Sequence, residues 1–140
     1  MNDMFMTLAV EQAKIALERN EVPVGAVIVK NGEVLFSSYN KKNLENVAVF
    51  HAEILCIIGA CKKLNSWHLD GCDLYVTLKP CSMCLYALAE ARVSSVYYLL
   101  DNNYNENLDS NYSKINCTLV PDTYKYNTLL GNFFSDLRKQ

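Results

Sequence analysis

The spacing of apolar positions divides the chain into helical and extended segments. Over residues 2–19 apolar side chains recur every third or fourth position, which predicts an amphipathic helix ending at Asn20, ahead of Pro23. The continuous β-branched run over 24–29 predicts a strand buried on both faces. Asn31-Gly32 is a strong hairpin signal, so we expect residues 33–39 to return as a second, antiparallel strand.

Helices and strands alternate in the rest of the chain. Residues 52–64 are apolar almost all round and predict a deeply packed helix, and residues 81–91 predict a shorter helix introduced by Pro80. The expected strands are 74–77, 96–100 and 117–120. Residues 101–114 are polar and rich in asparagine, and predict a long loop.

A last helix is expected from Pro121 onward. Its predicted buried stripe is Leu129, Leu130, Phe133, Phe134 and Leu137. The order of elements contains no repeat and no linker. It predicts one α/β domain over residues 1–140, in which helices cover both faces of a five-stranded mixed sheet, a three-layer α/β/α fold.

Charge and hydropathy limit the functions to consider. The net charge of −2 and the pI near 5.6 argue against a general nucleic-acid coat protein, but not against an enzyme that reads one nucleotide in a local pocket. No apolar run approaches the ~18 residues of a membrane span, and the first 20 residues do not resemble a signal peptide. We therefore expect a cytoplasmic protein with no membrane partner.

The chain has six cysteines, and in a reducing compartment thiols or metal ligands are more common than disulfides. Only Cys81 and Cys84 have the spacing of metal ligands. We interpret the other four as small buried hydrophobic residues. These are Cys56, Cys61, Cys72 and Cys117.

Two short segments, His51-Ala52-Glu53 and Pro80-Cys81-Ser82-Met83-Cys84, each open a predicted helix. The free N–H groups and positive dipole of a helix N-terminus favour thiolate over thiol. An i, i+3 spacing places both sulfurs on one helix face. One histidine and two thiolates make three ligands for Zn²⁺, the number typical of catalytic rather than structural zinc sites.

A fourth protein ligand is conceivable from one of the other cysteines or from His68, although none has a spacing that points to the site. Glu53 is two residues from His51 and would be a poor co-ligand. We expect it to shuttle protons between a zinc-bound hydroxide, a ring nitrogen and a departing amine, because zinc lowers the pKa of bound water to ~7.

Each motif alone is weak evidence for a catalytic zinc site. His-x-Glu occurs by chance in many proteins, and Cys-x-x-Cys more often marks a structural zinc knuckle or a redox pair. Both motifs in this order, each opening a helix of an α/β/α chain and with Pro80 directly before the first cysteine, favour a hydrolytic deaminase site.

At these residues the chain resembles the cytidine/deoxycytidylate deaminase superfamily, and within it the bacterial TadA-type tRNA adenosine deaminases, which make inosine at the wobble position. The similar stretches are 21–27, 51–54, 74–78 with 80–84, and 132–138. The resemblance implies a cytidine-deaminase-like fold, one Zn²⁺ per subunit, a homodimer, and the tRNA anticodon loop as partner.

The resemblance also implies roles by position. It makes His51, Cys81 and Cys84 the zinc ligands and Glu53 the proton shuttle. Asn40, Ala52 and Asp101 correspond to substrate contacts. For Asn40, an ordinary strand-end turn residue is an equally good interpretation.

This chain departs from the family pattern at several positions. Lys79 stands where glutamate is common, and residues 99–105 lack the usual lysine and glycines. His68 replaces a common arginine, and we interpret it as a surface or core-edge histidine rather than an RNA contact. Phosphate contacts need lysine or arginine. The candidates, which are alternatively only solvated charges, are Lys41, Lys42, Lys62, Lys63 and Lys79.

Three hypotheses follow. The first is a tRNA adenosine deaminase acting on an unpaired loop base. The second is a deaminase of a free base or nucleoside (guanine, cytosine or cytidine), which the acidic pI and the altered loop favour. The third is a zinc-stabilised, non-catalytic partner subunit, against which Glu53 argues, because a structural zinc site needs no such carboxylate.

Overall fold

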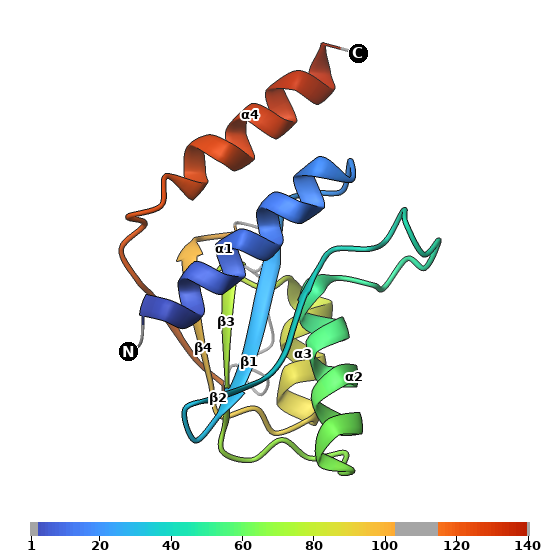
Figure 1. Ribbon diagram of the computed structural model, residues 1–140, viewed down its shortest axis with the longest axis vertical. Coiled ribbons are helices and arrows are strands. Elements are labelled where there is room, and N and C mark those ends of the chain that lie inside the picture. The colour runs from blue at the N-terminus through green and yellow to red at the C-terminus, as the bar shows by residue number, and fades with distance from the viewer. Residues whose placement is uncertain (1–2, 103–114, 140) are drawn as a thin grey trace.

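The computed structural model describes residues 3–102 and 115–139 (Figure 1). The helices are α1 (Asp3–Glu18), α2 (Ala52–Leu64), α3 (Ser82–Glu90) and α4 (Tyr126–Arg138). The strands are β1 (Gly25–Lys30), β2 (Glu33–Tyr39), β3 (Cys72–Leu78), β4 (Ser95–Leu100) and β5 (Asn116–Leu119). This order confirms the one predicted from the apolar pattern. Most of the predicted 101–114 loop lies outside the described residues.

The five strands form one mixed sheet in the order β2-β1-β3-β4-β5. Strand β1 is antiparallel to both β2 and β3, whereas β3, β4 and β5 are parallel. Asn31 and Gly32 join β1 to β2 with φ angles of 53° and 79°. Two positive φ angles are the requirement of the type I′ hairpin turn that Asn-Gly favours, so the predicted hairpin is confirmed.

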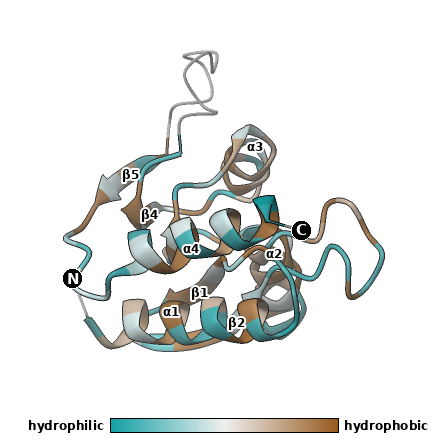
Figure 2. Cartoon of the chain, turned by 90° about the horizontal axis from the view of Figure 1, so that it is seen from above, coloured by the Kyte–Doolittle hydropathy of each residue, from teal (hydrophilic) through white to brown (hydrophobic). Residues whose placement is uncertain are grey.

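Side chains of β1 alternate between two apolar cores, one on each face of the sheet. Ala26 and Ile28 pack with residues of α2 and α3, and Val27 and Val29 pack with residues of α1 and α4. Burial on both faces explains why this strand is apolar without interruption. Figures 1 and 2 show α1 and α4 running side by side, which confirms the three-layer arrangement.

Helix α1 approaches β1 closely at Gly25. A Cβ atom at this position would overlap the carbonyl oxygen of Ala9 and the backbone nitrogen of Ala13. Only glycine permits this approach, because any side chain would push the helix away from the sheet.

The topology brings the starts of two helices together. Strands β2 and β3 run in the same direction, because both are antiparallel to β1. Helix α2 follows β2 and helix α3 follows β3, so both begin at the same edge of the sheet, where they pack against each other. The residues that precede these two helices therefore meet in space, although some 30 positions separate them in the sequence.

Helix α4 begins at Tyr126 and not at Pro121 as predicted. The Asp122 carboxylate accepts the backbone N–H groups of Tyr124, Tyr126 and Asn127 at 3.2, 3.0 and 3.0 Å. These bonds stabilise a turn ahead of the helix, and Lys125 at its N-cap has a φ of 56°. A short aspartate side chain can satisfy backbone donors in this way, and the turn therefore competes with an earlier helix start.

Two predictions of burial were wrong in part. In α4, Leu130 is buried, but Phe134 and Leu137 are 40% and 51% exposed. Helix α2 buries Ala52, Cys56 and Ala60, yet Ile58 on its other side is exposed. In both helices only one side packs against the described part of this chain. None of the described helices combines the length and hydropathy needed to cross a membrane.

Candidate zinc site and substrate pocket

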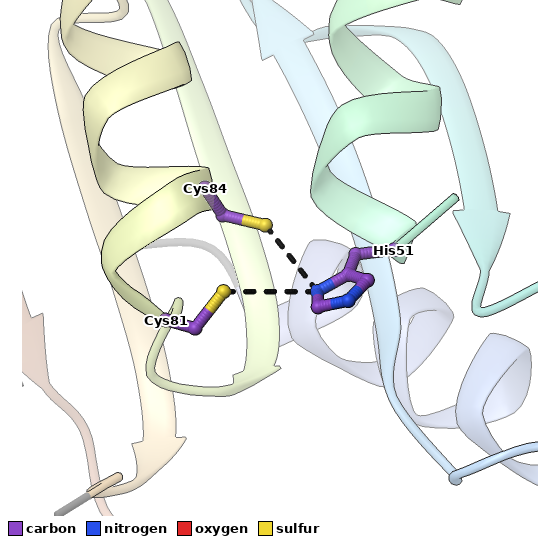
Figure 3. Close-up of side chains that lie close together, drawn as sticks. All are labelled: His51, Cys81 and Cys84. Carbon is purple, nitrogen blue, oxygen red and sulfur yellow. Dashed lines mark hydrogen bonds between the residues drawn. The ribbon is translucent and has the colours of Figure 1, made fainter. Parts of the chain in front are cut away.

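His51, Cys81 and Cys84 converge at the starts of α2 and α3 (Figure 3). Nδ1 of His51 lies 3.7 Å from Sγ of Cys81 and 3.6 Å from Sγ of Cys84. Bonds of about 2.3 Å to sulfur and 2.0–2.1 Å to nitrogen at tetrahedral angles place nitrogen and sulfur about 3.5 Å apart. The observed separations therefore fit a zinc ion held by these three atoms.

Both ligand-bearing helices leave the side chain at their N-cap free to turn toward the site. His51 is the N-cap of α2 and Cys81 the N-cap of α3, each with extended backbone and no capping hydrogen bond from its own side chain. In α2 the cap is supplied from another element, because Asn40 Oδ1 accepts the Ala52 N–H at 2.8 Å.

Close contact among the three side chains shifts the pKa of each. A hydrogen bond from Cys84 lowers the pKa of Cys81 to about 4, and His51 contributes in the same direction. The hydrogen bond with Cys81 raises the pKa of Cys84, and a separate hydrogen bond with Cys81 raises the pKa of His51. A thiolate is thus already favoured at Cys81, and the softer sulfur and imidazole donors suit Zn²⁺.

Among residues 3–102 and 115–139, no other group of three or more histidine, cysteine or acidic side chains has this geometry. The fourth-ligand candidates lie elsewhere. Cys56 is buried, donates to the Ala26 carbonyl at 3.4 Å and has a raised pKa because of burial. Cys61 donates to the Trp67 carbonyl at 3.6 Å. His68 is on the surface, 3.1 Å from Asp70.

Glu53 is only 4% exposed, and its Oε1 has no hydrogen-bond partner within the described structure. Burial raises the pKa of Glu53 to about 7. A carboxyl group with a pKa in this range can both accept and donate a proton near neutral pH, which is the property of a general acid and base. It lies beside the same cavity as His51 and Cys81.

This cavity has a volume of about 350 Å³. Of the three predicted substrate contacts, Asn40 lines the cavity, Ala52 is fully buried, and Asp101 is not among the lining residues. Asp101 instead accepts the backbone N–H of Asn102 at 2.7 Å, and Asn102 lines the cavity. A larger groove of about 900 Å³ between α1 and α4 contains none of the three ligand residues.

Several lining residues were missed from the sequence. They include Glu21, Asn43, Asn102 and Phe134. Phe134 was expected in the core, because its spacing on α4 matches a buried stripe. The other three are polar residues of turns and loops, for which periodicity carries no signal.

The structure separates the five lysines proposed as phosphate contacts. Lys42 and Lys79 line the cavity, and the Lys79 ammonium lies 5.7 Å from the centre of the Tyr98 ring. Lys41 lies over the Tyr39 ring at 4.7 Å. Lys62 and Lys63 are in the last turn of α2, at the opposite end of that helix from His51.

The chain is similar to known proteins in sequence. Residues 1–100 match the family of the cytidine and deoxycytidylate deaminase zinc-binding region. A tRNA-specific adenosine deaminase of Aquifex aeolicus is 46% identical over 69% of this chain and 64% of its own length. One from Bacillus subtilis is 44% identical over 69% and 60%, so the match spans about three fifths of these two relatives. One from Rickettsia felis is 38% identical over 95% of this chain and 100% of its own length.

Solved structures of other deaminases are also similar to this chain. A tRNA deaminase structure, from studies of A-to-I editing at the wobble position, has 35% identity and a TM-score of 0.78, covering 84% of this chain and 98% of its own. Guanine deaminase from Bacillus subtilis has 28% identity and a TM-score of 0.70, covering 100% and 96%. With these matches and the convergent histidine and cysteines, the chain belongs to the cytidine and deoxycytidylate deaminase family, and its relatives include proteins named tRNA-specific adenosine deaminase.

Proposed function

We propose that this protein hydrolyses adenosine to inosine at the wobble position of the tRNA anticodon loop. The observation that carries the proposal is the convergence of His51, Cys81 and Cys84 beside the buried, partnerless Oε1 of Glu53 at one cavity. The relatives that extend over most of this chain, named as tRNA-specific adenosine deaminases, support adenosine in tRNA as the substrate.

His51, Cys81 and Cys84 would hold one Zn²⁺ per subunit. Zinc at a three-ligand site acts as a Lewis acid that lowers the pKa of water toward neutrality. The spacing of the three ligand atoms and the low pKa of Cys81 support this assignment.

Glu53 would move the protons of the reaction. Its carboxylate accepts a proton from the attacking water as the new C–O bond forms at C6 of adenine, and delivers that proton to ring nitrogen N1. The same carboxyl group then takes the second proton to the exocyclic amine as the C6–N bond breaks, so that ammonia leaves and inosine remains. Burial beside the cavity keeps bulk water from competing for these protons.

Asn40 would orient the nucleoside. Because its Oδ1 accepts from Ala52, its amide nitrogen is the end that donates to the substrate. We propose further contacts from Ala52, at the start of α2, and from Asp101, which begins the segment after β4. An unpaired loop base can be turned into such a pocket at little cost, since no base pair is broken.

A homodimer is part of the proposal. An apolar helix is normally covered on all sides, yet Ile58 of α2 and Met83 of α3 are 37% and 36% exposed. A second copy of this chain would cover them, and the mass of the protein in solution tests this. A tRNA substrate and reduced zinc-ligand thiols also fit the expected cytoplasmic location.

One experiment separates the substrate hypotheses. Purified protein is incubated with an unmodified tRNA that carries a wobble adenosine, and separately with free guanine, cytosine, cytidine and adenosine. Inosine in the tRNA and its absence with Glu53→Ala are expected. The similarity to guanine deaminase makes guanine the most important competitor. Ammonia from a small molecule alone would contradict the tRNA assignment, and no turnover by either protein would support a non-catalytic subunit.

A further inference from the structure

Glu21 is a buried carboxylate outside the predicted catalytic set. It follows the turn at Asn20 that ends α1, and only 2% of it is exposed. One carboxylate oxygen accepts the backbone N–H of Asn43 at 3.1 Å, and the other accepts that of Leu44 at 2.6 Å. Glu21 therefore connects the end of α1 to a loop more than twenty residues away in the sequence.

That loop, residues 41–50, leaves β2 and returns to His51. Its base is closed by a bond from the Lys41 N–H to the Phe50 carbonyl at 2.9 Å. The bonds from Glu45 to Lys41 and from Val47 to Lys42 lie within the loop itself. Among the hydrogen bonds of the described residues, those of Glu21 are the ones that tie Asn43 and Leu44 to another part of the fold.

The same loop forms part of the substrate cavity. Lys42 and Asn43 line it, together with Glu21 itself. A buried carboxylate is stable only when its oxygens are well paired, and two charge-assisted bonds from adjacent N–H groups define both position and orientation. By binding Asn43 and Leu44, Glu21 determines the position of the loop that places Lys42 at the cavity.

We propose that Glu21 is a positioning residue that holds the 41–50 loop as a wall of the substrate cavity and so determines how the nucleotide fits. The substrate in this inference rests on the proposed function, but the connection between Glu21 and the loop does not. Because Glu21 acts on the shape of the pocket, its loss should weaken substrate binding and leave the proton transfers of Glu53 intact.

Glu21→Gln tests the proposal, because the amide keeps one acceptor and turns the other end into a donor facing an N–H group. We expect the KM for an anticodon stem-loop with a wobble adenosine to rise roughly tenfold, the loss from one hydrogen bond to a charged group. The kcat should stay within about twofold. Zinc content should be unchanged. Glu18→Gln removes the same charge from an exposed position on α1 and should match the wild type.

Two further measurements distinguish positioning from general stability. Hydrogen exchange of the Asn43 and Leu44 amides should accelerate in Glu21→Gln, because their acceptor is lost. The effect of Lys42→Met on KM should be smaller in the Glu21→Gln background, since the two residues act through one wall. Should Glu21→Gln fail to fold, Glu21→Asp, which keeps the charge on a shorter side chain, provides the same measurements.

Unchanged exchange at residues 43 and 44, an unchanged KM, or a fall in kcat with loss of zinc would each overturn the proposal. If the wild type does not deaminate the stem-loop, the proposed function fails. The role of Glu21 is then still decided by two comparisons of Glu21→Gln with the wild type. These are the hydrogen exchange of the Asn43 and Leu44 amides and the KM for whichever base the wild type deaminates.

Discussion

The Oδ1 atom of Asn40 accepts the Ala52 backbone N–H at 2.8 Å and so joins the end of β2 to the first turn of α2. The N-cap residue of α2, His51, forms no such bond with its own side chain. Asn40 therefore caps the start of α2 in place of the His51 side chain. The imidazole of His51 is then free to face Cys81 and Cys84.

Two substitutions of Asn40 should separate its capping role from its role in binding substrate. Asn40→Ala removes the cap and should lower the free energy of unfolding by about 1 kcal/mol as well as lowering activity. Asn40→Asp keeps an acceptor for Ala52 but has no N–H to donate, so stability should be retained while KM rises. Denaturant unfolding and initial rates measure the two effects. Equal loss of stability in both variants would contradict this assignment.

Removal of the metal should destabilise the protein through the same three residues. Metal analysis is expected to find about one zinc per chain in the wild type and little in Cys81→Ala. A chelator should lower the melting temperature of the wild type and leave that of Cys81→Ala unchanged, because only a ligand bound to the folded state contributes stability. Cys61→Ala is the matched control and should keep its zinc, since Cys61 hydrogen-bonds to Trp67 away from the site.

Lys79, which lines the cavity, should contribute a phosphate contact. Lys79→Met is expected to weaken tRNA binding and to reduce the slope of log affinity against log salt concentration by about 1, with little change in kcat. Lys63→Met at the far end of α2 should leave the slope unchanged. Equal slopes for Lys79→Met and the wild type would show that Lys79 is only a solvated charge.

The buried thiol of Cys56 should make the protein less stable at alkaline pH. Burial raises its pKa, so the folded state keeps the proton that the unfolded chain releases above a pH of about 8.5. Stability from this group is complete below that pH and decreases by about 1.4 kcal/mol for each further pH unit. Unfolding between pH 8 and 10 should show a shallower decline for Cys56→Ala. Val27→Ala, a core truncation without a titratable group, should keep the wild-type pH dependence.

Local pattern was sufficient for most of the fold. The order of elements, the Asn31-Gly32 hairpin and the bounds of β2 and α2 follow from periodicity and turn chemistry, which act over a few neighbouring residues. The start of α4 did not, because Asp122 holds a turn with its side chain. The exposure of Ile58 and Phe134 also could not be foreseen, since an apolar residue is buried only where another element covers it.

The sequence by itself determined the chemistry proposed for this protein: the three candidate zinc ligands, the carboxylate proposed to move protons, and the helices that these residues open. Tertiary structure alone decided that His51 and the two cysteines lie within bonding distance of one ion, because β2 and β3 must both run antiparallel to β1. It also decided that Asn40 caps α2 and that Glu21 holds the 41–50 loop. Such contacts join residues far apart in the chain, and no local spacing records them.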